Sequence, residues 1–278
     1  FDVTARSGWP ISGVDFTSRP RKQKPIAIAT GTMRGRAFEL KGIEVYCDWE
    51  TYESWLKRDG PWVAGFDFPF GLPREAIRDL GWPATWRELV LHCRLQGRES
   101  FRMALDRYRE SRPTGNRYAH RATDHPAGSH SPLKLVNPPV GLMFFEGAPR
   151  LLEAGVTIPG MCRGDPQRIA FEVYPGFATR QMVKGSYKND APAKQTPQRT
   201  RARTAIVAAL VSTDNPFGFA LSASPRTLKS LVRDATGDRL DAVLCALQAA
   251  WAFQRREEKY GLPAAIDPLE GWIAMVAN

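Results

Sequence analysis

Four acidic residues lie within stretches of the sequence that are otherwise apolar. They are Asp15, Asp67, Glu172 and Asp241, and each interrupts a run typical of a buried strand or helix. A buried carboxylate without a partner costs several kcal/mol or takes up a proton. Carboxylates around a divalent cation avoid that cost, because the cation supplies the missing positive charge. The four residues are far apart in the sequence, so only the fold could gather them, and the pattern predicts a shared catalytic metal site.

The residue types indicate which metal and which reaction such a site would serve. Mg²⁺ and Mn²⁺ prefer carboxylate oxygens, and two such ions about 4 Å apart can activate water and stabilise the leaving oxygen of a phosphodiester. Asp238 lies three residues before Asp241 and shares its helix face, so it is a further candidate metal ligand.

Each of these acidic residues also has a structural interpretation. Asp15 and Asp67 could accept hydrogen bonds within turns, and Glu172 could pair with a buried arginine. Asp238 could simply cap the helix that follows, and for this residue we favour that interpretation. The metal site is the stronger prediction for the others, because all of them fall on elements that one fold would bring together.

Apolar residues alternate with other residues in stretches that we predict to be strands. The strands of the first part of the chain are residues 11–17, 26–29, 36–46 and 62–67. In the third stretch the alternation slips by one residue at Gly42, which predicts a β-bulge. A short helix follows that stretch, with Asp48 or Thr51 as its N-cap.

The rest of the chain is mainly helical in period. We predict helices at residues 84–111, near 147–154, after Pro197 and at 236–256. Residues 168–174 form a fifth strand, whereas 112–141 show little periodicity, as in functional or mobile segments. This order predicts an α/β fold, namely a ribonuclease H-like mixed sheet flanked by helices. We expect one domain over residues 1–278, with a long helical insertion at 74–167 after the fourth strand.

Short motifs surround the acidic residues. They are Gly13-Val-Asp15-Phe-Thr, Gly65-Phe-Asp67-Phe-Pro-Phe-Gly-Leu-Pro73, Phe171-Glu172-Val-Tyr-Pro175 and Gly237-Asp238-Arg-Leu-Asp241-Ala. With these motifs the chain resembles a family of predicted ribonuclease H-like nucleases that is catalogued as a domain of unknown function (DUF429). The resemblance implies a ribonuclease H-like fold and a metal-dependent nuclease. One difference is that relatives often have adjacent acidic residues before the last helix, whereas here Gly237 precedes Asp238.

Several basic and polar residues are candidates for substrate binding. Lys188, Lys194 and Arg199 come before or at the start of a predicted helix, and a helix N-terminus binds phosphate readily. A solvated loop would have the same composition. Arg121 and Asp124 are candidates for substrate contacts or for a structural ion pair.

The composition favours some classes of protein and excludes others. The 278 residues carry a net charge of +10 and the pI is near 9.7, which favours a polyanionic partner such as RNA or DNA, although arginine richness alone would give the same charge. No apolar run approaches the ~20 residues that span a bilayer, so we expect no membrane partner. Four scattered cysteines and no secretion leader indicate reduced thiols and a cytoplasmic protein. The oligomeric state does not follow from the sequence.

Three functions are compatible with these residues. The leading hypothesis is a Mg²⁺- or Mn²⁺-dependent nuclease that hydrolyses phosphodiester bonds of nucleic acid. The second is a phosphotransferase or ATPase of the sugar-kinase and actin-like superfamily, because Asp15-Phe-Thr17-Ser18 is faintly similar to the phosphate loop of those enzymes. The third is a non-catalytic module that binds nucleic acid.

Overall fold

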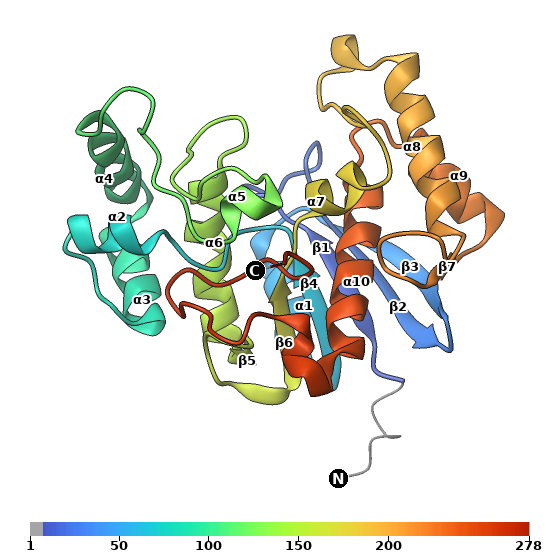
Figure 1. Cartoon of the computed structure of the whole chain (residues 1–278), viewed down its shortest axis with the longest axis horizontal. Helices are drawn as coiled ribbons and strands as arrows, with labels where there is room; N and C mark the ends of the chain where they lie inside the picture. Colours follow the sequence, from blue (N-terminus) through green and yellow to red (C-terminus); the bar gives the residue numbers. More distant parts are fainter. Residues whose placement is uncertain (1–7, 278) are drawn as a thin grey trace.

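The computed structural model of the protein describes residues 8–277. It has an α/β architecture in which helices flank a seven-stranded sheet (Figure 1). The strands are β1 (Ile11–Asp15), β2 (Ile26–Arg34), β3 (Ala37–Tyr46), β4 (Trp62–Phe66), β5 (Val156–Thr157), β6 (Asp165–Glu172) and β7 (Ala220–Ser222). The predicted α/β fold with a mixed sheet is therefore confirmed.

The order of the strands decides which chain ends meet. The sheet has the order β5-β6-β4-β1-β2-β3-β7. The pairs β1–β2 and β2–β3 are antiparallel, and the other neighbouring pairs are parallel. In the middle of the sheet β1, β4 and β6 run side by side in the same direction, so their carboxyl ends lie at one edge. This arrangement is compatible with the ribonuclease H-like plan expected from the sequence.

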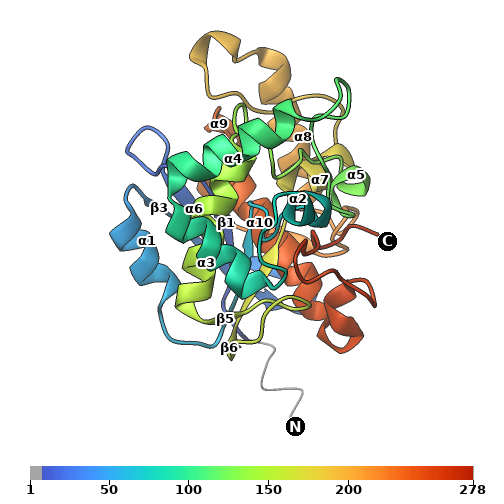
Figure 2. The ribbon, with the colours of Figure 1, turned by 90° about the vertical axis from the view of Figure 1, so that its left-hand side faces the viewer.

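Helices cover both faces of the sheet. They are α1 (Trp49–Leu56), α2 (Arg74–Asp79), α3 (Trp86–Gln96), α4 (Arg98–Glu110), α5 (Asp124–Ala127), α6 (Val140–Ala154), α7 (Pro175–Arg180), α8 (Pro197–Leu210), α9 (Pro225–Arg233) and α10 (Asp238–Gln254), with 3₁₀ turns at Pro192–Lys194 and Arg256–Gly261. Between β4 and β6 lie α2 to α6 and β5, and Figure 2 shows α3, α4 and α6 grouped on one side of the molecule. No helix of residues 8–277 is both long and apolar enough to cross a membrane.

The central strands bury both of their faces. Side chains of a strand point alternately to opposite faces, and in β4 Ala64 and Phe66 belong to one apolar cluster while Val63 belongs to another. The first cluster includes residues of α1, α3, α4 and α6, and the second includes residues of α8, α9 and α10. A strand buried on both faces reads as a continuous apolar run, which is why an acidic residue in such a run is conspicuous.

Some element boundaries differ from the sequence-based prediction. Residues 84–111 form two helices rather than one, because Gly97 has a φ of 82° and interrupts the helix between α3 and α4. The helix predicted near 147–154 begins already at Val140. The strand predicted at 168–174 spans Asp165–Glu172. The bulge is confirmed, since Thr30 pairs with Gly42 but Gly31 pairs with Leu40.

Candidate active site: a carboxylate cluster in a cleft

Three of the predicted acidic residues lie at the ends of adjacent parallel strands. Asp15 is the last residue of β1, Asp67 follows β4 directly, and Glu172 is the last residue of β6. The register places Val14 opposite Phe66, and Phe66 opposite Glu172. The backbone N–H of Asp67 continues this ladder by donating to the carbonyl of Val14 at 3.0 Å. The three residues therefore lie at one edge of the sheet, with Glu172 on the face of Phe66 and with Asp15 and Asp67 on the opposite face.

Two glycines let α10 reach this edge. Gly13 and Gly65 face each other in the β1–β4 ladder. A Cβ added at Gly13 would lie 2.0 Å from the backbone nitrogen of Ala246, and one added at Gly65 would lie 2.6 Å from the carbonyl oxygen of Cys245. Only glycine allows a helix to lie so close to two strands. This close packing places the first turn of α10, with Asp241, beside the ends of β1 and β4.

Asp241 is fully buried and paired. It accepts hydrogen bonds from the Tyr187 hydroxyl at 2.5 Å and from the Lys188 ammonium. Burial raises the pKa of Asp241, and the neighbouring Lys188 charge opposes that rise. The side chain of Lys188 is still 37% exposed, so this cation lies at the boundary between the core and the solvent.

Asp15 and Asp67 differ from Asp241 in having no hydrogen-bond partner for their carboxylates among residues 8–277. Neither carboxylate forms a hydrogen bond with any residue of the described part of the chain, although Asp15 is only 6% exposed. Burial raises the pKa of Asp15 well above its usual range, and Asp241 and Asp238 raise it further while Lys188 lowers it. Burial likewise raises the pKa of Asp67 to about 7. We call Asp15, Asp67 and Asp241 the cleft acid cluster.

Lys188 is the main positive charge within the cleft acid cluster. Burial would lower the pKa of Lys188, but the carboxylates of Asp241, Asp15 and Asp67 raise it well above its usual range. Lys24 also lowers the pKa of Asp15 and of Asp67, so two ammonium groups face the three carboxylates and the neighbouring Asp238. The cluster therefore has a surplus of negative charge whenever its carboxylates are ionised.

Asp238 does not cap α10, which corrects our interpretation of this residue. The N-cap is Gly237 in a left-handed conformation, and Asp238 is the first residue of the helix. The Asp238 carboxylate instead accepts a hydrogen bond from the Lys24 ammonium at 2.7 Å, and Lys24 also contacts Asp190 at 3.2 Å. Asp238 still acts on the cleft acid cluster, because its negative charge raises the pKa of Asp15.

A cleft of about 540 Å³ opens beside these residues. Its lining includes Asp15, Asp67, Lys24 and Lys188, together with residues of the 129–143 segment. The volume is within the range of about 300–1,000 Å³ that is usual for ligand sites. Unpaired carboxylates with raised pKa values in such a cleft are a typical mark of a functional site.

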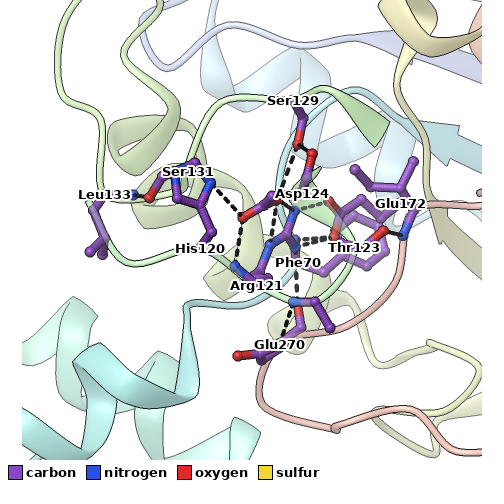
Figure 3. Close-up of polar contacts among 12 residues, drawn as sticks. Phe70, His120, Arg121, Thr123, Asp124, Ser129, Ser131, Leu133, Glu172 and Glu270 are labelled. Atoms are coloured by element: carbon purple, nitrogen blue, oxygen red, sulfur yellow. Dashed lines mark hydrogen bonds and ion pairs between the residues drawn. The ribbon is translucent and has the colours of Figure 1, made fainter. Parts of the chain in front are cut away.

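Glu172, in contrast, is held by a buried arginine. Both of its carboxylate oxygens accept hydrogen bonds from Arg121, at 2.7 and 2.8 Å, and one also accepts from the backbone N–H of Phe70 (Figure 3). Arg121 also binds the fully buried Asp124. Burial raises the pKa of Glu172, against the lowering effect of Arg121. We call Arg121, Asp124 and Glu172 the Arg121 network.

The Arg121 network joins three distant parts of the chain. Arg121 and Asp124 come from the insertion between β4 and β6, and Glu172 ends β6. Arg121 also donates to the carbonyl of Glu270, and the Glu270 carboxylate accepts from the backbone N–H of Ala122. The sequence allows Arg121 and Asp124 either to contact a substrate or to form a structural ion pair. The ion pair is present in the structure. Arg121 and Glu172 additionally line the cleft, whereas Asp124 does not.

The remaining substrate-binding candidates lie elsewhere. Lys194 ends the 3₁₀ turn before α8 and is exposed, and Arg199 lies in the first turn of α8. Arg199 donates to the carbonyl of Lys194 and to the Ser186 hydroxyl rather than toward the cleft acid cluster. Neither residue lines the cleft, whereas Lys188 does.

Two residues of the site were not singled out from the sequence. Lys24 follows the loop after β1 and pairs with Asp238 across 214 residues of chain, and Tyr187 donates to Asp241. No local pattern distinguishes this lysine from the other basic residues around it. The position of Tyr187 directly before Lys188 is a signal that could have been used, because an aromatic residue in a polar loop often marks a buried contact.

The fit of a metal ion depends on the donor atoms present. The cleft acid cluster offers oxygen donors only, which is the ligand type of Mg²⁺ and Mn²⁺. Across residues 8–277 no three His, Cys, Asp or Glu side chains are already arranged as a metal-ligand group. In the cleft acid cluster the positive charge comes from Lys188. The donor chemistry thus fits a hard divalent cation, provided that Lys188 leaves Asp241.

Comparison with known proteins assigns the chain to a family. Residues 13–266 match the family described as "Protein of unknown function (DUF429)", and the chain belongs to this family. Searches of curated proteins and of solved structures found no match. The match confirms the DUF429 membership that the sequence motifs indicated, and it assigns neither a ribonuclease H-like fold nor an activity.

Proposed function

We propose that the protein is a divalent-metal-dependent nuclease, that is, a hydrolase of phosphodiester bonds in nucleic acid. One observation carries the proposal: the carboxylates of Asp15 and Asp67 end adjacent parallel strands, line a cleft, and have no hydrogen-bond partner in the described chain. Asp15 is buried and Asp67 is half-buried at the wall of the cleft, so both carboxylates are free to bind a ligand there. Burial raises the pKa of Asp67 to about 7, and a nearby cation would oppose this rise by stabilising the ionised form.

The residues of the chain have distinct roles in this proposal. Asp15, Asp67 and Asp241 would hold Mg²⁺ or Mn²⁺, with Asp238 as a further candidate ligand. The partly exposed side chain of Lys188 would then be free to leave Asp241 and to contact a substrate phosphate. The bound cation would lower the pKa of a water nucleophile and stabilise the leaving oxygen.

Glu172 supports the site rather than holding the cation directly. Its carboxylate oxygens are already engaged by Arg121 and by the backbone N–H of Phe70. The hydrogen bond to Phe70 fixes the turn Asp67-Phe-Pro-Phe70, which carries the Asp67 carboxylate. We therefore assign Glu172 to the positioning of Asp67, a role that the sequence alone did not separate from metal binding.

A nucleic-acid substrate is favoured by the charge around the cleft. The loop between β1 and β2 carries Arg19, Arg21 and Lys22, which are exposed, and its residues Ser18 and Lys24 line the cleft. Basic residues at the mouth of a site contact a phosphate backbone independently of sequence. The net charge of +10 adds a longer-range attraction for a polyanion. Such binding should weaken steeply with salt.

The cysteines are compatible with a cytoplasmic protein, which we also propose. All four are free thiols, two of them buried. Free thiols of this kind are usual where the medium is reducing. Fractionation of cells that produce the tagged full-length protein would test the location.

A cleavage assay tests the proposed activity. Purified protein is incubated with end-labelled single-stranded, double-stranded and RNA–DNA hybrid substrates in Mn²⁺, with EDTA and an Asp15→Asn variant as controls. The proposal expects cleavage of at least one substrate that EDTA and the variant both abolish. Cleavage that survives in Asp15→Asn, or no cleavage of any substrate, contradicts it. Tight ATP binding without cleavage would support the phosphotransferase alternative instead.

A further inference from the structure

The cleft has an apolar part that metal binding and phosphate binding do not explain. Besides the acidic and basic residues, its lining includes a set of apolar and aromatic side chains: Phe68, Pro138, Pro139, Val140, Met143 and Tyr174. A divalent cation and a phosphate group need oxygen and nitrogen partners, and neither gains from an apolar wall. The wall must therefore contact a part of the ligand that has an apolar face.

From this lining we propose that the cleft holds a nucleobase subsite, which takes one unpaired base of the substrate while the adjoining phosphate lies at the cleft acid cluster. The inference rests on the proposed nuclease function and specifies its substrate class. Bases stack on aromatic and apolar side chains with little dependence on sequence, because every base has a π-face. Of the parts of a nucleic acid, only the base offers such a face next to a phosphate.

The wall also offers polar groups at its rim. Asn137 adopts a φ of 46°, a left-handed conformation that asparagine tolerates better than most residues. Its exposed side-chain amide forms no hydrogen bond with any described residue, yet it lines the cleft. An amide can donate and accept at the same time, as the edge of a base requires. His130 lines the same part of the cleft and lies 3.3 Å from the Lys134 ammonium.

The volume of the cleft indicates whether it accepts an unpaired base or a duplex. A volume of about 540 Å³ is that of a small-molecule site. In a duplex the faces of the bases are covered by their neighbours, so the apolar wall could contact a base only after it had been unstacked. A single strand, or the frayed end of a strand, presents the base without most of that cost. The structure thus favours single-stranded over double-stranded substrates.

A binding experiment tests the nucleobase subsite without depending on cleavage. Adenosine 5′-monophosphate and ribose 5-phosphate share the sugar and the phosphate, and only the first carries a base. Calorimetry in Mn²⁺ should give an affinity for adenosine 5′-monophosphate on the order of tenfold higher. Met143→Ala should reduce this preference severalfold, and Asn137→Ala should reduce it further. The matched control is Met103→Ala, since Met103 is an exposed methionine of α4 outside the cleft and should leave the preference unchanged.

Each outcome distinguishes the subsite from the proposed activity. Equal affinity for the two compounds, or a preference that Met143→Ala does not alter, overturns the subsite. A preference for the base in a protein that cleaves no substrate keeps the subsite and removes the nuclease proposal. If the protein does cleave, a single strand should be cut about tenfold faster than the same sequence in a blunt duplex. Equal rates would contradict the subsite while leaving the nuclease proposal in place.

Discussion

Two groups of buried carboxylates lie side by side in this protein, and they are compensated in different ways. In the Arg121 network, a guanidinium that is 2% exposed forms hydrogen bonds with both Glu172 and Asp124. In the cleft acid cluster, the compensating charge is a lysine with a partly exposed side chain, and Asp15 and Asp67 have no hydrogen-bond partner among the described residues. A fixed, satisfied ion network holds the fold, whereas an under-compensated cluster beside a cleft is suited to binding a cation.

The type of basic residue is part of this difference. Arginine presents a planar fork of donors that matches two carboxylates at once and stays charged even when buried. Lysine is a single ammonium on a flexible stem, which can leave one partner for another. At this edge of the sheet, the ion pairs around Glu172 are thus permanent, whereas the ion pair of Asp241 with its lysine can be exchanged for another partner.

Removal of the arginine should have the largest effect on stability. Arg121→Met leaves Glu172 and Asp124 buried without their partner, so we expect the free energy of unfolding to fall by about 3–5 kcal/mol. Urea denaturation at neutral pH measures this change. The control is Arg74→Met, which breaks the ion pair with Asp267 near the surface and should cost less than about 1 kcal/mol. Equal losses in the two variants would mean that the Arg121 network does not hold the fold.

In the cleft acid cluster, removal of a charge should instead raise the free energy of unfolding. The pKa of Asp67 is about 7 in the folded protein and near 3.8 when unperturbed. Between these values the folded state binds more protons than the unfolded state, so stability falls as pH rises from about 4 to 7. Asp67→Asn should remove this part of the pH dependence. In EDTA at pH 8 the variant should be more stable than the wild type by a few kcal/mol, at most about 4.

Urea denaturation across this pH range, with EDTA present, measures the effect. The exposed Asp59 provides the control, and Asp59→Asn should retain the wild-type slope. If Asp67→Asn is less stable than the wild type at pH 8, or if both variants have the same slope, Asp67 is not an under-compensated carboxylate.

The close packing of α10 on the strands connects the two groups. Gly13→Ala would place a Cβ about 2 Å from the backbone nitrogen of Ala246, so α10 must shift, and we expect a loss of about 1–3 kcal/mol. Gly42→Ala is the control, because nothing lies within 4 Å of a Cβ added at Gly42. Thermal unfolding of both variants measures the difference. If Gly13→Ala leaves the thermal stability unchanged, α10 does not approach β1 as closely as described.

The exchangeable lysine should set the affinity for the cation. Lys188→Met removes the ammonium that competes with a metal ion for Asp241, so we expect the affinity for Mn²⁺ to increase about tenfold. Calorimetric titration with Mn²⁺ measures this change. Lys57→Met, which affects only a surface pair with Glu153, should leave the affinity unaltered. A weaker affinity in Lys188→Met would mean that this lysine supports the ion rather than competing with it.

The sequence predicted the elements that carry the acidic residues, because each interrupts an apolar run with a clear period. The strands that carry Asp15 and Asp67 and the helix that begins near Asp241 follow from such local patterns, although β1 ends at Asp15 and not at residue 17 as predicted. The ion-pair partners of these acidic residues did not follow from the sequence. Lys24 pairs with Asp238 over 214 residues of chain, and no local rule selects one lysine among many. The cap at Gly237 and the break at Gly97 depend on positive φ angles, and the apolar periodicity of the sequence does not show where these occur.

The same limit applies to the difference between Glu172 and the other carboxylates. In the sequence all of them are acidic residues in apolar surroundings, and a shared metal site is the simplest common explanation. Only the fold shows that Arg121, from a segment with little periodicity, reaches Glu172 while no arginine contacts Asp15 or Asp67 within residues 8–277. Which carboxylates are compensated is a property of tertiary contacts.

The central claim is that the cleft acid cluster is completed by a cation that takes the place of the Lys188 ammonium. A crystal structure of the full chain soaked in Mn²⁺, with anomalous data collected for manganese, tests this directly. The account predicts an anomalous peak among Asp15, Asp67 and Asp241, with Lys188 moved away from Asp241 and the Arg121 network unchanged. A peak bound by Glu172 in place of Arg121, or Lys188 still bonded to Asp241 with no peak in the cleft, would contradict it.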